Sequence, residues 1–410
     1  MPYDTSRRKL LGTVAGGAAF GLAGCLGDDD DDVENGAILI PGIYDISGGT
    51  SDVGEPAAEG GIDMWNYLID EGYTEDLEVD HDWVDYAYEV DEAVRVYDDV
   101  RDQNPPCIIG WGTADTEALA PDVAEDEIVY ISASYSEALM QPDTPYNFFV
   151  NLDYTSQARV HLEWIADNDP GATISFIFSD NPFGRSPVEG GEAYAEELGL
   201  EVGPQLELGL GAASAESQLR RAREDEVEYL IHQNTAAPME VLVADRPDVY
   251  PEVEIMGLTY TTDELRVEES PELFEGVRFS GAFRTFDEAL DSESGDVIEA
   301  MFDTYRDDDL DDREVANLNY IRGMLHTLTA WRAMMNADED GDLDPRSGAD
   351  FREGMFQIDG WDGWDLIEPI SYEEDDRRPT MTGNVWEVQD GEMVLDETYE
   401  LPRREEWIQG

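Results

Sequence analysis

The stretch CIIGWGTADTEALAPDVAEDEIVYIS, residues 107–132, decides the fold class. Residues 107–110 and 128–132 are short apolar runs that fit buried strands. Segment 117–126 between them predicts a short helix. A strand, a helix and a second strand in succession predict a parallel pair, because parallel strands need a long crossover connection.

The same alternation continues on both sides of this unit. Ala58, Ile62, Trp65 and Ile69 recur at the spacing of one helix face after an apolar run at 37–43. The expected strands are 37–43, 77–85, 107–110, 128–132, 173–179, 200–208, 227–232, 254–258 and 277–283. A mostly helical block at 296–356 precedes further strand patterns at 364–372 and 384–394. The chain is therefore expected to cross back between two series of strands.

The predicted fold class is α/β, with two lobes, each a parallel sheet flanked by helices. We expect the first lobe to comprise residues 37–154 and 284–365, and the second lobe to comprise residues 155–283 and 366–410.

The charge balance excludes several functions. The 97 acidic residues outnumber the 24 basic ones, which gives a formal net charge of -73. Nucleic acid and anionic membrane surfaces both require clustered basic residues, so neither is an expected partner. Because 41% of residues are apolar, the chain can build a core, and the acidic residues must coat its surface. Such a surface repels itself unless salt screens it, so a halophile's protein is expected.

The amino-terminal segment contrasts with the acidic body. Arg7, Arg8 and Lys9 precede an apolar run over 10–24, the pattern of an export signal, and the run is too short for a spanning helix. SRRKLL resembles the twin-arginine signal, and LAGC resembles a lipobox, in which Cys25 would be lipidated. The alternatives are a plain signal peptide with a chance cysteine and an uncleaved anchor. The predicted location is the outer face of the cell membrane.

Residues 26–36 are expected to form an acidic tether, because their five consecutive aspartates repel one another. The tether would follow a signal spanning residues 1–25. It would hold the folded body away from the membrane, so that the lipid on Cys25 is the only membrane contact.

Four further stretches together resemble one family, the substrate-binding lipoproteins of ABC transporters for branched-chain amino acids and amides, in a haloarchaeal form. They are IPGIYDISGGTSDVGEPAAEGGIDMWNYLID (40–70), CIIGWGTADTEALAPDVAEDEIVYISASYSEAL (107–139), FIFSDNPFGRSPVEGGEAYAEELGLEV (176–202) and EEDDRRPTMTGNVWEVQDGEMV (373–394). The resemblance covers residues 37–400. It implies two lobes that close on a small ligand and a membrane permease, with its ATPase subunits, as partners.

Candidate ligand residues follow the expected strands, where loops meet helix amino termini. In the first lobe these are Ser47, Thr113, Asp115, Thr116, Ser134, Tyr135 and Ser136. In the second lobe they are Phe183 and Tyr260. The alternative is that the hydroxyl groups only cap helices and turns, which they favour in any case. By resemblance, the loops at 113–116 and 134–136 would hold the carboxylate and ammonium of an amino acid.

Two departures from the family pattern bear on the ligand. Phe183 stands where a tyrosine is usual, and residues 257–264 present hydroxyl groups before the acid Asp263. Amino-acid binders usually place an acid in this last region to meet the ammonium group. Asp115 is the alternative source of that charge.

No metal, cofactor or catalytic constellation is expected. Asn336, Asp338, Asp340 and Asp342 follow the start of an EF-hand-like calcium loop, but Ser347 stands at the closing glutamate position. A solvated acidic loop is the alternative there. The four histidines are scattered, and no zinc spacing, nucleophile elbow or phosphate-binding loop occurs in the sequence.

The predicted function is the extracytoplasmic solute-binding protein of an ABC importer. It would capture a small carboxylate- or amide-bearing solute by cleft closure, with branched-chain amino acids as the default ligand. An amide, urea or aromatic acid is the alternative ligand, and a surface ligand-sensing receptor with the same fold is the alternative function. An enzyme is not expected.

Overall fold

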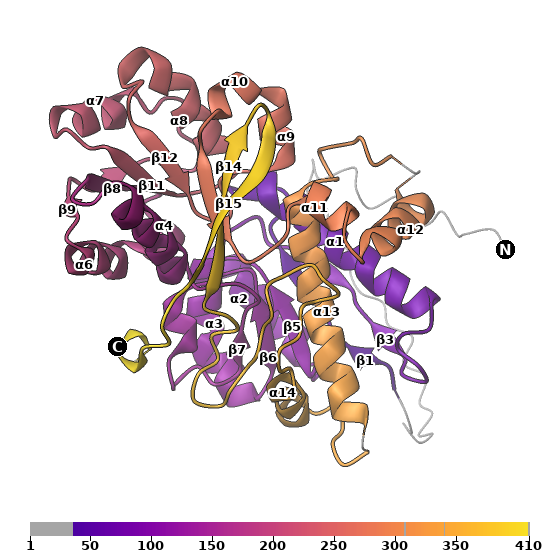
Figure 1. The fold of residues 1–410 in the computed structure, drawn as a ribbon. Helices are drawn as coiled ribbons and strands as arrows, with labels where there is room; N and C mark the ends of the chain where they lie inside the picture. The colour runs from indigo at the N-terminus through magenta and orange to yellow at the C-terminus, as the bar shows by residue number, and fades with distance from the viewer. Residues whose placement is uncertain (1–35, 307–308, 340, 409–410) are drawn as a thin grey trace, which may run out of the picture. The chain divides into compact units, whose positions relative to one another are not determined.

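The computed structural model describes residues 36–306, 309–339 and 341–408, in which strands and helices alternate as predicted (Figure 1). The expected export signal, including Cys25, and all of the expected tether except Gly36 lie outside the described residues. Residues 37–410 form one compact unit. Within the described part of the chain, no helix has the length and apolar character needed to cross a membrane.

The first sheet has five parallel strands in the order β4-β2-β5-β6-β7. They are β2 (Gly42–Tyr44), β4 (Trp83–Asp85), β5 (Cys107–Gly110), β6 (Val129–Ser132) and β7 (Asn147–Phe148). All residues of β5 and β6 are buried, as expected for a parallel sheet covered on both faces. The two strands that bracket residues 107–132 are therefore confirmed.

The expected strand 37–43 forms two short strands instead of one. β1 (Ile38–Leu39) pairs with β3 (Val79–Asp80) in a separate two-stranded sheet, and β2 begins at Gly42. The break includes Pro41, which has no N–H group for a ladder hydrogen bond. The expected strand 77–85 divides in the same way, into β3 and β4.

The second sheet has eight strands, ordered β10-β8-β11-β12-β13-β14-β15, with β9 beside β8. They are β8 (Thr173–Phe178), β9 (Glu201–Val202), β10 (Leu206–Glu207), β11 (Tyr229–Gln233), β12 (Glu254–Gly257), β13 (Arg278–Gly281), β14 (Thr382–Gln389) and β15 (Glu392–Glu400). Strands β8 to β13 pair in parallel, whereas β14 and β15 are antiparallel at the edge.

The antiparallel pairing of β15 with β14 follows from the turn between them. Asp390 and Gly391 both have positive φ, 53° and 84°, which suits a two-residue hairpin. The strand expected at 364–372 is wrong, because that segment forms only the isolated bridges Phe283–Ile367 and Trp361–Ile370. Gly363, Trp364 and Asp365 all have positive φ there, which an extended strand cannot contain.

The helices occupy the connections between strands. They are α1 (Ser51–Asp70), α2 (Val90–Arg101), α3 (Thr113–Asp126), α4 (Tyr154–Asn168), α5 (Pro182–Arg185), α6 (Val188–Leu198), α7 (Glu216–Glu224), α8 (Ala236–Val249), α9 (Glu264–Glu269), α10 (Pro271–Phe274), α11 (Phe286–Leu290), α12 (Gly295–Tyr305), α13 (Leu318–Glu339) and α14 (Gly348–Phe356). Two 3₁₀ turns, η2 (Glu137–Met140) and η3 (Glu405–Trp407), complete the elements used below.

Helices α1 and α13 lie side by side (Figure 1). A Cβ atom on Gly323 would lie 1.8 Å from the carbonyl oxygen of Ala57, and one on Gly60 would lie 2.1 Å from that of Tyr320. The helices approach this closely because glycine has no side chain at the contact. The helical block expected at 296–356 is thus confirmed, while the boundaries of the two lobes stay a prediction.

Candidate functional site

Both sheets contain a point at which the chain changes direction across the sheet. In the first sheet the chain goes from β2 to β4 on one side and then to β5 on the other. In the second sheet it goes from β8 to β9 and β10 on one side and then to β11 on the other. Ligands of open α/β sheets bind at the carboxyl ends of the strands that flank such a point.

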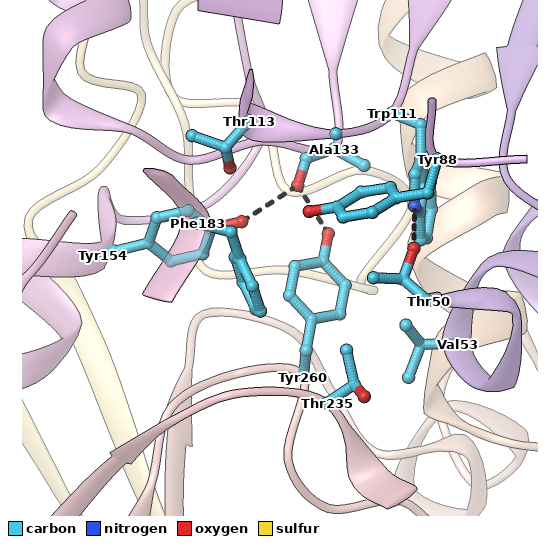
Figure 2. Close-up of a pocket in the computed structure, with 11 residues that line it drawn as sticks. Thr50, Val53, Tyr88, Trp111, Thr113, Ala133, Tyr154, Phe183, Thr235 and Tyr260 are labelled. Carbon is cyan, nitrogen blue, oxygen red and sulfur yellow. Dashed lines mark hydrogen bonds between the residues drawn. The ribbon is translucent and has the colours of Figure 1, made fainter. Parts of the chain in front are cut away.

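A small pocket lies at these strand ends (Figure 2). Segments that follow strands of the first sheet supply most of its lining. Segments that follow β8, β11 and β12 of the second sheet supply the rest. The lining residues are Thr50, Val53, Tyr88, Trp111, Gly112, Thr113, Ala133, Tyr154, Phe183, Thr235 and Tyr260. Thr113, Phe183 and Tyr260 are therefore the predicted site residues that the structure brings together.

Aromatic rings form much of the pocket wall. Tyr260, which follows β12, lies with its ring centroid 6.0 Å from that of Trp111 and 6.2 Å from that of Phe183. Its hydroxyl donates a hydrogen bond of 2.7 Å to the carbonyl oxygen of Ala133, which follows β6 (Figure 2). Tyr154 also donates to this oxygen, at 3.4 Å. One peptide carbonyl thus joins the loops of both sheets at the pocket.

Hydroxyl groups hold the polar side of the pocket in place. The indole N–H of Trp111 donates to the Thr50 hydroxyl oxygen at 2.9 Å, and that hydroxyl donates to the Asp45 carboxylate at 2.7 Å. The same carboxylate accepts a hydrogen bond of 2.6 Å from the N–H of Gly48. Buried Asp45 therefore fixes the loop after β2 that carries Thr50.

Several helices begin at the pocket, α3 and α8 among them. Thr113 is the first residue of α3, and Thr235 is the N-cap residue of α8. Helix amino termini present N–H groups and partial positive charge, which favour a carboxylate or carbonyl oxygen. At α8 the N–H of Ala237 already donates to Asp52 Oδ2, at 2.9 Å. None of the lining residues that the structure describes carries a charged side chain. The pocket is suited to a small solute with an apolar body and an oxygen-bearing end.

Asp115 lies beside the pocket but does not line it. A Cβ atom on Gly112 would lie 2.3 Å from Asp115 Oδ1 and 2.7 Å from the ring of Tyr88, so Gly112 fills the space between them. The Tyr86 hydroxyl donates to Asp115 Oδ1 at 2.9 Å, while Oδ2 is buried without a hydrogen-bond partner. Burial raises the pKa of this carboxyl group to about 6.

Other predicted hydroxyl residues hold loops together. Ser47 is exposed and donates to Asp85 at 2.5 Å. Thr116 donates to the carbonyl oxygen of Gly112, also at 2.5 Å. Ser134 donates to the hydroxyl oxygen of Thr113 at 2.9 Å, so it supports a residue that lines the pocket.

The side chains of Tyr135 and Ser136, which follow Ser134 in the loop after β6, contact other parts of the protein. The Tyr135 ring stacks on that of Tyr260 at 5.6 Å with an interplanar angle of 6°, and its hydroxyl lies 3.4 Å from His326 Nε2. Ser136 donates to Glu117 at 2.6 Å and borders a separate, wider groove. Both side chains therefore point away from the small pocket.

The sequence analysis did not select the aromatic lining residues Tyr88, Trp111 and Tyr154. Trp111 directly follows strand β5, and Tyr88 lies shortly after β4. The rule that selected Thr113, a position just beyond a strand, would have selected Trp111 as well.

The acidic loop after α13 stays an untested alternative for calcium. Asp340 lies outside the described residues. Asn336 is buried, and its side-chain amide donates to the carbonyl oxygen of Gly354 at 2.9 Å, so it connects α13 with α14. Among residues 36–306, 309–339 and 341–408, no group of three or more histidine, cysteine or acidic side chains is arranged to hold a metal ion.

The sequence profile of one family, described as periplasmic binding protein, matches residues 37–392. The chain belongs to the periplasmic binding protein family. This match spans both sheets up to the start of β15, and it confirms the family resemblance that the four sequence stretches indicate. A comparison with curated proteins finds no match.

Solved structures of other periplasmic binding proteins have the same fold. A branched-chain amino acid ABC transporter protein from Thermus thermophilus with bound valine has a TM-score of 0.82 and 22% identity, covering 90% of this chain and 97% of that one. A substrate-binding protein of an ABC transporter from Aeropyrum pernix has a TM-score of 0.80 and 26% identity, covering 91% and 98%. A Rhodopseudomonas palustris solute-binding protein in complex with benzoate has a TM-score of 0.73 and 13% identity, covering 88% and 96%.

Proposed function

We propose that this periplasmic binding protein captures a small carboxylate- or amide-bearing solute outside the cytoplasm and delivers it to the permease of an ABC importer. The pocket carries the proposal, because residues that follow strands of both sheets line it and Tyr260 bonds Ala133 across it. A ligand that contacts both sets of loops stabilises the arrangement in which they meet, so binding shifts the population towards it. The solute is bound and released without chemical change.

Branched-chain amino acids are the first ligand to test. Val53 and the rings of Trp111 and Phe183 offer an apolar surface for an aliphatic side chain. The start of α3 at Thr113 offers N–H groups for a carboxylate. The relative from Thermus thermophilus, whose fold this chain shares, was solved with valine bound.

A second candidate ligand is a carboxylic acid or amide that has no ammonium group. The observation that favours it is the absence of a charged side chain among the lining residues that the structure describes. An ammonium group would need Asp115, which lies behind Gly112 and whose pKa burial raises to about 6. The relative from Rhodopseudomonas palustris was solved with benzoate, an acid of this kind.

A thermal-shift panel on residues 37–410 in molar KCl tests the function and separates the two ligand classes. The panel contains leucine, isoleucine, valine, small amides, urea and aromatic acids. A ligand at 100 times its dissociation constant adds about 2.7 kcal/mol to the free energy of unfolding, which raises the melting temperature visibly. A shift with valine or leucine supports the amino-acid ligand, and a shift only with amides or acids supports the second class. No shift in the folded protein contradicts both.

We also propose that the chain is exported by the twin-arginine route and anchored through Cys25. The motifs SRRKLL and LAGC at residues 6–11 and 22–25 support this proposal. The Cys25→Ala chain should then leave the membrane fraction of its native host for the medium. Retention of this variant in the membrane fraction would contradict the lipid anchor.

A further inference from the structure

Arg322 on α13 is buried and has unusual partners for an arginine. It is 1% exposed, and its guanidinium donates to the side-chain carbonyl of Asn319 and to the peptide carbonyl of Thr259. A third contact, of 3.3 Å, reaches the hydroxyl oxygen of Thr259. These partners are neutral oxygens rather than carboxylates, and a charge buried without a counter-charge at contact is costly.

The guanidinium lies against the ring of Tyr260. Its central carbon is 4.8 Å from the Tyr260 ring centroid and 5.7 Å from that of Phe283. Tyr135 stacks on the same Tyr260 ring at 5.6 Å. A planar guanidinium against an aromatic face forms a cation–π contact, which strengthens when water is excluded. Arg322 therefore fixes the orientation of a ring that lines the pocket.

The contacts of Arg322 also connect elements from different sheets. Helix α13 packs on α1 at Gly323, and it contacts β5 and β6 of the first sheet. Thr259 and Tyr260 follow β12 of the second sheet. Arg322 thus holds a pocket wall of the second sheet against a helix that packs on the first.

Asn319 and Asp263 form a second connection between α13 and the loop that carries Tyr260. The amide of Asn319 donates to Asp263 Oδ2 at 3.3 Å, and Asp263 Oδ1 accepts the N–H of Arg266 at 3.0 Å. The loop 259–263 is therefore attached to α13 at both of its ends. Among the contacts of Arg322, the one with a residue that lines the pocket is the contact with Tyr260, so the attachment acts on that ring.

We propose that Arg322 is a positioning residue of the ligand pocket, which sets ligand affinity by holding Tyr260 in place without touching the ligand. The part of the proposal that concerns affinity rests on the proposed function. The part that concerns the position of Tyr260 does not, and it can be measured without any ligand.

The first test labels residues 37–410 with 5-fluorotryptophan and assigns the fluorine resonance of Trp111 with Trp111→Phe. The Trp111 and Tyr260 ring centroids are 6.0 Å apart, so this resonance reports on the Tyr260 ring. Arg322→Lys keeps the positive charge but removes the planar fork. We expect it to shift the Trp111 resonance in the ligand-free protein.

Arg377→Lys is the matched control. Arg377 is another buried arginine, and its guanidinium donates to the carbonyl oxygens of Leu139, Gln141, Thr144 and Asn147, away from Tyr260. The Arg377→Lys variant should therefore leave the Trp111 resonance unchanged. An unshifted Trp111 resonance in folded Arg322→Lys overturns the proposal. If that variant does not fold, Asn319→Ala removes one guanidinium partner, and an unshifted resonance there overturns the proposal equally.

The second test titrates L-valine and benzoate into each variant. Arg322→Lys should weaken binding of the better probe by about tenfold, the factor expected for one lost hydrogen bond to a charged group. In a Tyr260→Leu background the same change should add less than about twofold, because the effect passes through Tyr260. An undiminished tenfold loss in that background overturns the proposal. If neither probe binds the wild type, the ligand assignment fails, while the Trp111 resonance still decides the role of Arg322.

Discussion

At the scale of single residues, Tyr260 connects the pocket with the rest of the protein. Its hydroxyl reaches Ala133 of the first sheet's loops, and its ring lies against Trp111, Phe183 and Tyr135. Its position beyond β12 marked it as a site residue in the sequence. The partner of its hydroxyl is a peptide carbonyl far along the chain, which no sequence pattern reveals.

Tyr260→Phe should weaken ligand binding while changing the fold little. The variant keeps the ring but removes the 2.7 Å hydrogen bond to Ala133. One such bond contributes about 1 kcal/mol, so the dissociation constant should rise roughly fivefold. Calorimetric titration with the panel compound that binds best measures this. An unchanged dissociation constant would contradict a role for this bond in holding the pocket closed.

Asp115→Asn should remove a pH dependence of stability. Burial raises the Asp115 pKa from 3.8 to about 6, so between these pH values the folded state holds a proton that the unfolded state has lost. The contribution of Asp115 to the free energy of unfolding therefore falls as pH rises, by up to roughly 3 kcal/mol. Urea unfolding of both proteins at pH 4 and pH 7 measures it. Relative to wild type, the variant should have a higher free energy of unfolding at pH 7 than at pH 4. If the difference in free energy between the two proteins is the same at both pH values, this account is contradicted.

Residue chemistry explains why the sequence predicted only part of the site. Hydroxyl groups are common both at ligand sites and at helix caps, so Thr113 and Thr116 look alike in sequence. In the structure Thr113 lines the pocket, whereas Thr116 bonds the carbonyl of Gly112 within α3. Whether a threonine lines the pocket or bonds the backbone of the preceding turn depends on where α3 begins. The structure begins it at Thr113, four residues before the expected start.

At the scale of elements, the contact between α1 and α13 has little room for a larger side chain. The Cβ atom of Gly323→Ala would meet the Ala57 carbonyl oxygen at 1.8 Å, which backbone atoms cannot avoid without moving a helix. We expect the free energy of unfolding to fall by roughly 1–3 kcal/mol, as for other overpacked cores. Gly209→Ala is the control, because no atom lies within 4 Å of its Cβ position. Equal stability of the two variants, measured by urea unfolding, would contradict the close packing.

Most elements could be predicted because their patterns are long and periodic. Helices α1 and α13 are of this kind, whereas the short strands β5 and β6 could be predicted from apolar runs on either side of a helix. The errors fall where a local backbone property overrides the apolar pattern. Pro41 separates β1 from β2, and three consecutive residues with positive φ, 363–365, prevent a strand in an apolar segment. Proline was visible in the sequence, whereas positive φ at Trp364 was not.

At the scale of the whole molecule, the net charge of -73 predicts that stability depends on salt. Its carboxylates repel one another at low ionic strength, and salt screens that repulsion. The melting temperature should therefore rise steeply as KCl increases from about 0.2 M to 3 M. Sucrose at equal osmolality is the control, because it carries no charge and should raise the melting temperature less. Equal effects of sucrose and KCl would show that charge screening is not the cause.

The family and the two-sheet arrangement could be predicted from the order of motifs over residues 37–400, because each loop follows a recognisable strand. The ligand could not, because it depends on which side chains from loops far apart in sequence meet in one pocket. Trp111 and Tyr260 are 149 positions apart by their numbering, yet their ring centroids lie 6.0 Å apart.

Calorimetric titration of wild type, Trp111→Ala and Ser47→Ala with the compound that gives the largest thermal shift tests the central claim most directly. Trp111 lines the pocket, whereas Ser47 follows the same sheet but lies exposed outside it. We predict binding of one molecule per chain, a loss of at least about tenfold in affinity for Trp111→Ala, and a change within about twofold for Ser47→Ala. Undiminished binding by folded Trp111→Ala would contradict the claim that this pocket is the ligand site.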